Sequence, residues 1–237
     1  MSFDLGKIQT KKIIFEARFK KTFSYSDKKN IIAEKFLEDY ENWLIDEKGI
    51  IHFIDPDKKY YVFFENGRIG FDFDLPKEAS FMRGKIKKAL DTYHSFLPLT
   101  EFRRIGLRFF ALYPLEYKFD EAVSILEKTL YIKNSKLDQI LSNKFSDLSY
   151  NNVFDKGKYR FHLQLGAVKK DEIYNRIKRA VEKEGEKEEY PDIAFFIDLD
   201  CSCEKCLFNE RVDFVDKGYE ENLKIIQGIL EHVLEAL

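Results

Sequence analysis

Three cysteines within six residues form the densest group of reactive side chains in the sequence. Cys201, Cys203 and Cys206 are the only cysteines of the chain. The C-x-x-C spacing of the last two lets a pair of thiolates share a metal ion or form a disulfide. A closed zinc site needs a fourth ligand, for which the candidates are Asp200, Glu204, a distant histidine or a cysteine of a second subunit. The cluster therefore suggests zinc as a cofactor, and the alternative is a local redox-sensitive loop.

A second group of charged side chains lies on a predicted central strand, residues 102–113. Strand alternation places Arg104 and Arg108 on one face, with Gly106 between them and Phe102 beside them. Two arginines on so apolar a strand are unusual. One interpretation is an anion-binding site, in which the glycine makes room for a ligand between two guanidinium groups.

The other interpretation pairs these arginines with carboxylates across the sheet. Asp198 and Asp200 alternate in the same way on a later predicted strand, residues 191–201. Removing one partner of a buried ion pair costs ~3–5 kcal/mol, so such a layer can be essential without any ligand. We favour this interpretation, and it predicts one sheet in which Arg104 or Arg108 lies within salt-bridge distance of Asp198 or Asp200.

The remaining charged patterns carry less information. Asp72 and Asp74 repeat the D-x-D spacing, and we expect them on a solvent face because Phe71 and Phe73 point the other way. Two basic runs have the composition of phosphate contacts but are also typical of solvated helix and strand faces. These runs are Lys11, Lys12, Arg18, Lys20, Lys21 and Arg83, Lys85, Lys87, Lys88.

Recognised catalytic motifs are absent from the sequence. The four histidines show no H-E-x-x-H spacing, and no G-x-S-x-G, Walker loop or G-x-G-x-x-G is present. We therefore assign no residue a catalytic role, and the sequence leans away from an enzyme.

Composition indicates a chain with a large core and no dominant charge. Forty basic residues face 42 acidic ones, for a net charge of −2, so the whole-chain charge does not support a nucleic-acid partner. No apolar run reaches the ~18 residues of a membrane span. The first residues lack the apolar stretch of a secretion signal, so we predict a cytoplasmic protein without a membrane segment.

The elements that must position these residues follow from periodicity and turn signals. The first half predicts a strand at 12–23, a helix from Ser26 or Asp27 to about Asp46 that includes Trp43, and a three-strand meander with an Asn66-Gly67 hairpin. A helix over 77–96 and the strand at 102–113 follow. The second half predicts helices at 119–131, 136–143, 170–184 and 217–237, strands at 145–154, 158–167 and 191–201, a charged loop at 182–190, and a loop around the cysteines.

This element order predicts an α+β fold with a mainly antiparallel sheet and a C-terminal amphipathic helix. Each half resembles the split βαβ order of a ferredoxin-like unit. We place a boundary after Pro114, which divides the chain into residues 1–116 and 117–237, or leaves one continuous domain.

The C-terminal helix carries an apolar seam that bears on association. Its residues recur at alternating steps of four and three, which is a heptad pattern. A stripe this wide commonly packs on its own sheet, and it can also extend into a two-fold homodimer contact. The seam residues are Tyr219, Leu223, Ile226, Leu230, Val233 and Leu237.

Four segments together resemble a sporadically distributed family of uncharacterised prokaryotic proteins. They are the early I-F-E-x-R-F strand at Ile14–Phe19, the central R-I-G-L-R strand at Arg104–Arg108, the late D-x-D strand at Asp198–Asp200, and the C-terminal helix at 217–237. Members often continue the central motif with Tyr and Asn, whereas this chain has Phe109–Ala111. The resemblance implies no enzyme class, cofactor or ligand.

These observations lead to one functional prediction and two alternatives. We predict a non-enzymatic interaction or scaffold protein that forms a homodimer. One alternative is a nucleic-acid-binding or RNA-processing module with tandem ferredoxin-like units, which would require the two basic runs to cluster on one face. The other is a protein that binds a small anionic ligand through Arg104 and Arg108.

Overall fold

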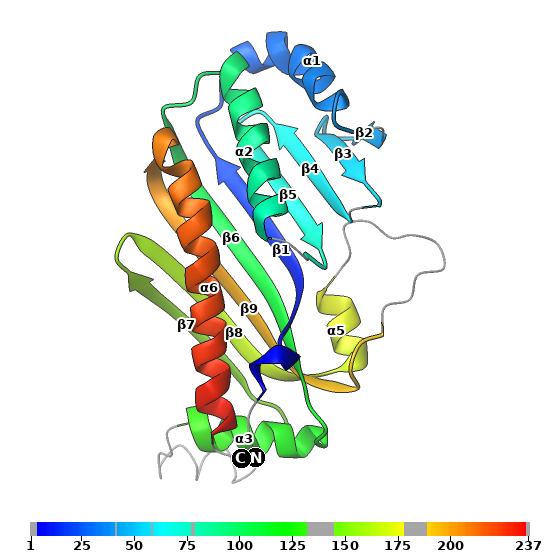
Figure 1. The fold of residues 1–237 in the computed structure, drawn as a ribbon, viewed down its shortest axis with the longest axis vertical. Coiled ribbons are helices and arrows are strands. Elements are labelled where there is room, and N and C mark those ends of the chain that lie inside the picture. Colours follow the sequence, from blue (N-terminus) through cyan, green and yellow to red (C-terminus); the bar gives the residue numbers. More distant parts are fainter. Residues whose placement is uncertain are drawn as a thin grey trace.

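One antiparallel sheet organises the chain. The computed structural model describes residues 4–40, 42–57, 59–76, 79–131, 145–177 and 189–235, and within them nine strands lie in the order β2-β3-β4-β5-β1-β6-β9-β8-β7 (Figure 1). The strands are β1 (Gln9–Arg18), β2 (Asn42–Ile45), β3 (Ile51–Asp55), β4 (Tyr60–Glu65), β5 (Arg68–Asp74), β6 (Glu101–Pro114), β7 (Ser149–Lys156), β8 (Tyr159–Lys169) and β9 (Ile193–Leu207). The α+β class and the antiparallel sheet are as predicted.

Five α-helices accompany the sheet in the described part of the chain. They are α1 (Ser24–Leu37), α2 (Ala79–Phe96), α3 (Phe119–Leu130), α5 (Lys170–Arg176) and α6 (Arg211–Leu234), with short 3-10 turns η1 (Leu5–Lys7) and η2 (Phe208–Glu210). None of these helices has the length and apolar character to cross a membrane. The predicted helix at 136–143 and most of the predicted loop at 182–190 fall outside the described residues.

The two faces of the sheet differ because side chains alternate along every strand. The helix face buries Phe15 of β1, Leu107 of β6 and Leu199 of β9 in one large core under α1, α2, α3 and α6. Figure 1 shows α2 and α6 lying across this face. We call the opposite side the polar face, because it carries the charged side chains of β1, β6 and β9. Part of it forms a smaller core in which α5 covers Phe110 and Phe196.

Turn chemistry sets the first meander as predicted. Gly67 adopts φ +92°, a conformation that glycine enters at little cost, in the hairpin between β4 and β5. The hairpin tip also holds the segment that follows β1, since Phe19 N–H donates to the Gly67 carbonyl at 2.9 Å and Thr22 N–H donates to Asn66 Oδ1 at 2.9 Å.

The first helix is shorter than predicted. It ends at Leu37, and the expected helical residue Trp43 lies instead on β2, which pairs with β3. A turn creates this hairpin: Asp46 Oδ1 accepts the backbone N–H groups of Lys48 and Ile50, each at 2.9 Å, and Gly49 has φ +77°. The helical spacing of the apolar residues was therefore misleading, because a turn at residues 46–49 outweighs it.

The cysteine segment is a strand and not the predicted loop. β9 continues to Leu207 and pairs with β6 through Cys206 and Phe102. Lys205 has φ +54°, and the pairing skips from Arg104–Glu204 to Phe102–Cys206. The alternation of side chains breaks here without a shift in register, and Phe102 lies in the large core, away from the arginine face on which simple alternation placed it.

The C-terminal helix uses its apolar seam within the chain. Ile226, Leu230 and Val233 are buried in the large core, and Asn222 Nδ2 donates to the Leu107 carbonyl at 3.0 Å. Tyr219 packs edge-on against Phe109 with ring centroids 5.3 Å apart. The described part of the seam thus packs on its own sheet, Leu237 lies outside the described residues, and a homodimer remains a prediction.

The sheet runs across the proposed domain boundary. The connection from β6 to α3 falls at residues 115–118, yet β6 pairs with β1 of the first half and with β9 of the second. α5 ends at Arg176, within the predicted helix at 170–184, and residues 178–184 lie outside the described residues.

A glycine in β5 provides a test of packing on the polar face. A Cβ on Gly70 would lie 2.5 Å from the Phe63 ring and 3.1 Å from the Phe15 carbonyl. We expect Gly70→Ala to lower the free energy of unfolding by about 1–3 kcal/mol in urea titrations, because the ring must move. The control is Gly228→Ala in α6, where nothing lies within 4 Å, and helix propensity predicts a gain of about 0.5–1 kcal/mol. Equal effects at both positions would contradict this packing.

Candidate functional site

The arginines and aspartates singled out from the sequence meet on the polar face. Arg108 binds Asp198 through two parallel hydrogen bonds, Nε to Oδ1 at 2.7 Å and Nη2 to Oδ2 at 2.5 Å. Arg104 Nη2 donates to Asp200 Oδ2 at 2.5 Å. Both pairs connect the adjacent strands β6 and β9, as the matched alternation predicted. Bidentate arginine–carboxylate bonding fixes geometry as well as contributing energy.

The register makes both ion pairs diagonal. Arg108 lies directly opposite Asp200 but reaches Asp198, while Arg104 lies opposite Glu204 and reaches Asp200. The Arg104 guanidinium therefore passes over Gly106, whose added Cβ would lie 2.7 Å from Arg104 Nη1. Gly106 makes room for the neighbouring arginine. The anion-site interpretation had this glycine make room for a ligand instead.

Burial differs between the two partners of the stronger pair. The Asp198 side chain is 10% exposed, whereas Arg108 is 47% exposed. The hydrogen bonds that Arg108 donates to Asp198 raise the pKa of Arg108, so the guanidinium stays charged. The arrangement thus neutralises a buried carboxylate with a cation that still touches solvent, and it favours ion pairing over anion binding.

A shallow hollow of about 430 Å³ adjoins these pairs. β8 contributes His162, opposite Asp200, and Gln164, opposite Asp198, while β7 contributes Asn151, opposite Gln164. Amide, imidazole and carboxylate groups in one hollow can hydrogen-bond a polar uncharged ligand. The sequence assigns His162 no role, because the histidines lack a recognised motif spacing. One sequence pattern could have placed His162 at this site: His162 and Gln164 alternate along their strand in the same way as Asp198 and Asp200.

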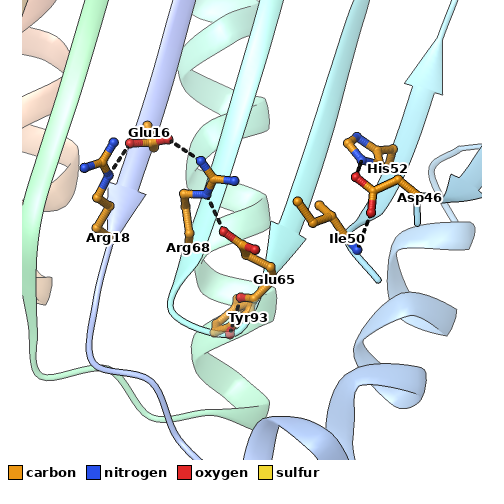
Figure 2. A network of polar contacts seen from close by, with 8 residues as sticks. All are labelled: Glu16, Arg18, Asp46, Ile50, His52, Glu65, Arg68 and Tyr93. Atoms are coloured by element: carbon orange, nitrogen blue, oxygen red, sulfur yellow. Dashed lines mark hydrogen bonds and ion pairs between the residues drawn. The ribbon is translucent and has the colours of Figure 1, made fainter. Parts of the chain in front are cut away.

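Next to this site a second ion network crosses β1, β4 and β5 (Figure 2). Glu16 Oε1 accepts from Arg18 Nε at 2.5 Å, and Glu16 Oε2 accepts from Arg68 Nη1 at 3.2 Å. Arg68 Nε lies 2.6 Å from Glu65 Oε1, and its guanidinium covers the Phe63 ring at 4.8 Å. The charges of the polar face are therefore largely satisfied by one another.

The second aspartate pair is buried, which corrects the expected solvent position. Asp72 and Asp74 are 6% and 4% exposed, and Lys12 Nζ lies 2.7 Å from Asp72 Oδ2 and 3.8 Å from Asp74 Oδ1. Burial raises the pKa of Asp72 to about 7, although the charge of Lys12 lowers it. Desolvation of the carboxylate outweighs the ion pair here.

The three cysteines lie on a buried strand, and the zinc site expected of them stays a prediction. Cys201 lies on the helix face, and a Cβ on Gly218 of α6 would be 3.7 Å from its Sγ. Cys203 Sγ donates to the Glu204 carbonyl and Cys206 Sγ donates to the Leu207 carbonyl, each at 3.6 Å, and all three cysteines are buried free thiols. Within the described residues no three His, Cys, Asp or Glu side chains are grouped to hold a metal ion.

Burial also explains why these thiols are poor nucleophiles and ligands. It raises the pKa of Cys201 and of Cys206 to about 12, so neither forms thiolate readily at neutral pH. The close sequence spacing reflects a strand that packs small side chains against α6, and not a loop that gathers ligands.

The chain matches neither a protein-family model nor a curated protein sequence.

The Arg108–Asp198 pair predicts a measurable coupling. We expect Arg108→Met to lower the free energy of unfolding by about 1–3 kcal/mol, because it leaves a buried carboxylate unpaired. Adding Asp198→Asn should recover part of this loss, since the stranded charge is then absent. The control is Arg160→Met, whose exposed partner Asp155 predicts a change within about 0.5 kcal/mol. Additive costs in the double variant would contradict the coupling.

Asp72 predicts how stability depends on pH. Because its folded pKa is about 7 and its ordinary value is 3.8, the folded state binds more protons between those pH values. Stability should therefore fall as pH rises from about 4 to about 7. We expect the melting temperature of Asp72→Asn to fall less than that of the parent between pH 5 and pH 8. Parallel melting curves across this range would contradict the assignment.

Proposed function

We propose that this protein is an interaction module that binds an extended segment of a partner protein along the edge strand β2. The observation that carries the proposal is the exposure of the whole strand. Trp43 is 54%, Leu44 is 44% and Ile45 is 57% exposed, whereas the adjacent strand β3 buries Ile51 and Phe53. Exposed apolar edges are sites of strand addition.

The hydrogen bonds of β2 support an open edge. Asp46 N–H donates to the Ile50 carbonyl at 3.0 Å, toward β3. Since antiparallel bonding alternates along a strand, the N–H and carbonyl groups of Trp43 and Ile45 point away from β3. No strand lies on that side among the described residues. Two residues thus present backbone donors and acceptors beside apolar side chains.

Protective features are missing from β2. Natural edge strands commonly carry lysine, proline or a bulge, and the sequence NWLI has no lysine or proline. Its pairing with β3 runs without a register shift. The opposite edge, β7, differs, since it holds two asparagines and ends in Asp155 and Lys156.

Charge around β2 favours a basic partner over a second copy. Residues 38–48 contain five acids and one base, namely Glu38, Asp39, Glu41, Asp46, Glu47 and Lys48. Two of these acids have partners within the chain, since Glu38 pairs with Lys35 and Asp39 pairs with Lys88. A two-fold pairing of β2 with itself would bring acids near acids, and opposed like charges are destabilising. We therefore commit to a partner segment with alternating apolar residues and flanking lysines or arginines.

The arrangement of the first half supports a ferredoxin-like origin for this module. Four strands lie in the order β4-β5-β1-β6. Helices α1 and α2 cover one face of these strands, as in a split βαβ unit. The edge strands β2 and β3 extend this unit. We do not extend the proposal to the second half, where β9 lies between β6 and β8.

The single tryptophan of the chain gives a direct test. A synthetic peptide of alternating valine and threonine, flanked by lysines, should shift Trp43 emission to shorter wavelength as it excludes water from the ring. Ile45→Pro removes an outward N–H without removing a β2–β3 bond, and it should weaken binding at least about tenfold. Ile45→Thr, which keeps the donor, should weaken binding less.

Two controls decide between outcomes. The same peptide flanked by glutamates should bind more weakly, and equal binding would contradict the charge argument. Light scattering of the protein alone tests the homodimer. A dimer that dissociates in the Trp43→Lys variant would show that β2 binds a second copy of the chain, which would contradict the proposed partner segment. No emission shift with the lysine-flanked peptide would contradict the proposed function.

A further inference from the structure

A basic groove lies at the end of the sheet where β1 finishes and β6 begins. It has a volume of about 610 Å³ and is lined by four cations and one carboxylate, with apolar residues beneath them. The charged groups are Lys20, Lys21, Lys28, Arg103 and Glu101. A local excess of positive charge therefore exists in a chain whose net charge is −2.

These cations differ from those on the polar face because they are not neutralised. Within the described residues Lys20, Lys21 and Arg103 form no ion pair, whereas the neighbouring Arg104 binds Asp200. Other cations of the two basic runs also differ from these three, because they are ion-paired. Lys12 of the first basic run is buried on Asp72, and in the second run Arg83 binds Asp216 and Lys88 binds Asp39. Among the described residues, several cations of the two basic runs are thus neutralised by carboxylates, whereas Lys20 and Lys21 in this groove are not.

The backbone of the groove is held in place by neighbouring elements. The bonds from Phe19 N–H to Gly67 and from Thr22 N–H to Asn66 fasten the Lys20-Lys21 segment to the β4–β5 hairpin. Lys28 Nζ donates to the Phe96 carbonyl at 2.7 Å, at the end of α2. Binding an anion would therefore order long side chains but not the main chain, which lowers its entropic cost.

An aromatic ring projects from the same segment. Phe23 follows Lys21 and Thr22 directly, lies between two lining residues without lining the groove itself, and is 98% exposed at the start of α1. A fully exposed phenylalanine makes no contribution to the core. Beside unpaired lysines it has the character of a stacking platform, the second component of sites that hold single-stranded nucleic acid.

We propose that this groove binds single-stranded nucleic acid, with phosphates on Lys20, Lys21 and Arg103 and a base stacked on Phe23. The concave shape favours a flexible polyanion chain over a membrane surface, because lipid headgroups require cations and aromatic rings on a protruding surface. The inference is independent of the partner segment proposed for β2, since the groove and β2 share no residue.

Fluorescence anisotropy of a labelled oligothymidylate tests the proposal. With three to four phosphates neutralised, the logarithm of the binding constant should fall with the logarithm of salt concentration at a slope of about −2 to −3. The double variant Lys20→Gln/Lys21→Gln should weaken binding about tenfold and make this slope less negative by about 1.4. Phe23→Ala should weaken binding and leave the slope unchanged, since stacking releases no counterions.

A matched control and a competing surface make the test decisive. Lys87→Gln/Lys88→Gln removes the same charge from α2, outside the groove, and should leave binding within about twofold. Each variant is checked by circular dichroism and thermal melting. An equal loss in this control, or the absence of binding at low salt, would overturn the proposal. So would Phe23-dependent binding to phosphatidylglycerol vesicles without binding to the oligonucleotide.

Discussion

The pairing of β6 with β9 through two arginine–aspartate ion pairs is the constraint on which the rest of the sheet depends. Both strands have buried residues on each face, and they connect the meander of the first half to the hairpin of the second. A slip of one residue would place Arg104 and Arg108 under α6 and expose Leu107 and Phe109. The charged layer therefore specifies the register, and the apolar layer beneath α6 supplies most of the stability.

Because of this constraint, the groups that remain available for binding lie at the margins of the sheet. The charges at its centre bind one another, so Arg104, Arg108, Asp198 and Asp200 make a structural layer with a small polar hollow beside it. Two features lack such compensation: the open edge of β2 and the cations at the end of β1. Loops and edges can carry uncompensated groups because they are not required to pack on both sides.

Helix α1 links these two margins and intensifies the charge at each. It begins beside the Lys20-Lys21 segment and ends beside Glu38 and Asp39, so the flanking charges have the same sign as the nearby end of the helix dipole. Asp27 in the first turn and Lys35 in the last offset this within the helix. The flanking charges lower the stability of the helix. They also strengthen the attraction for an anion at its start and for a cation at its end, which fits two distinct binding surfaces.

The sequence by itself determined the α+β class, most of the strands and the pairing of the charged layer. Alternation of Arg104 with Arg108 and of Asp198 with Asp200 was sufficient, because a half-polar strand has only one register that keeps its apolar residues covered. Other features depended on tertiary contacts. A turn at residues 46–49 moved Trp43 from a helix to an edge, and a break in alternation near Lys205 leaves Phe102 and Cys206 in the core. Periodicity describes one element at a time, whereas burial of Asp72 and the cysteines, and the gathering of Lys20, Lys28 and Arg103 in one groove, follow from which elements meet in space.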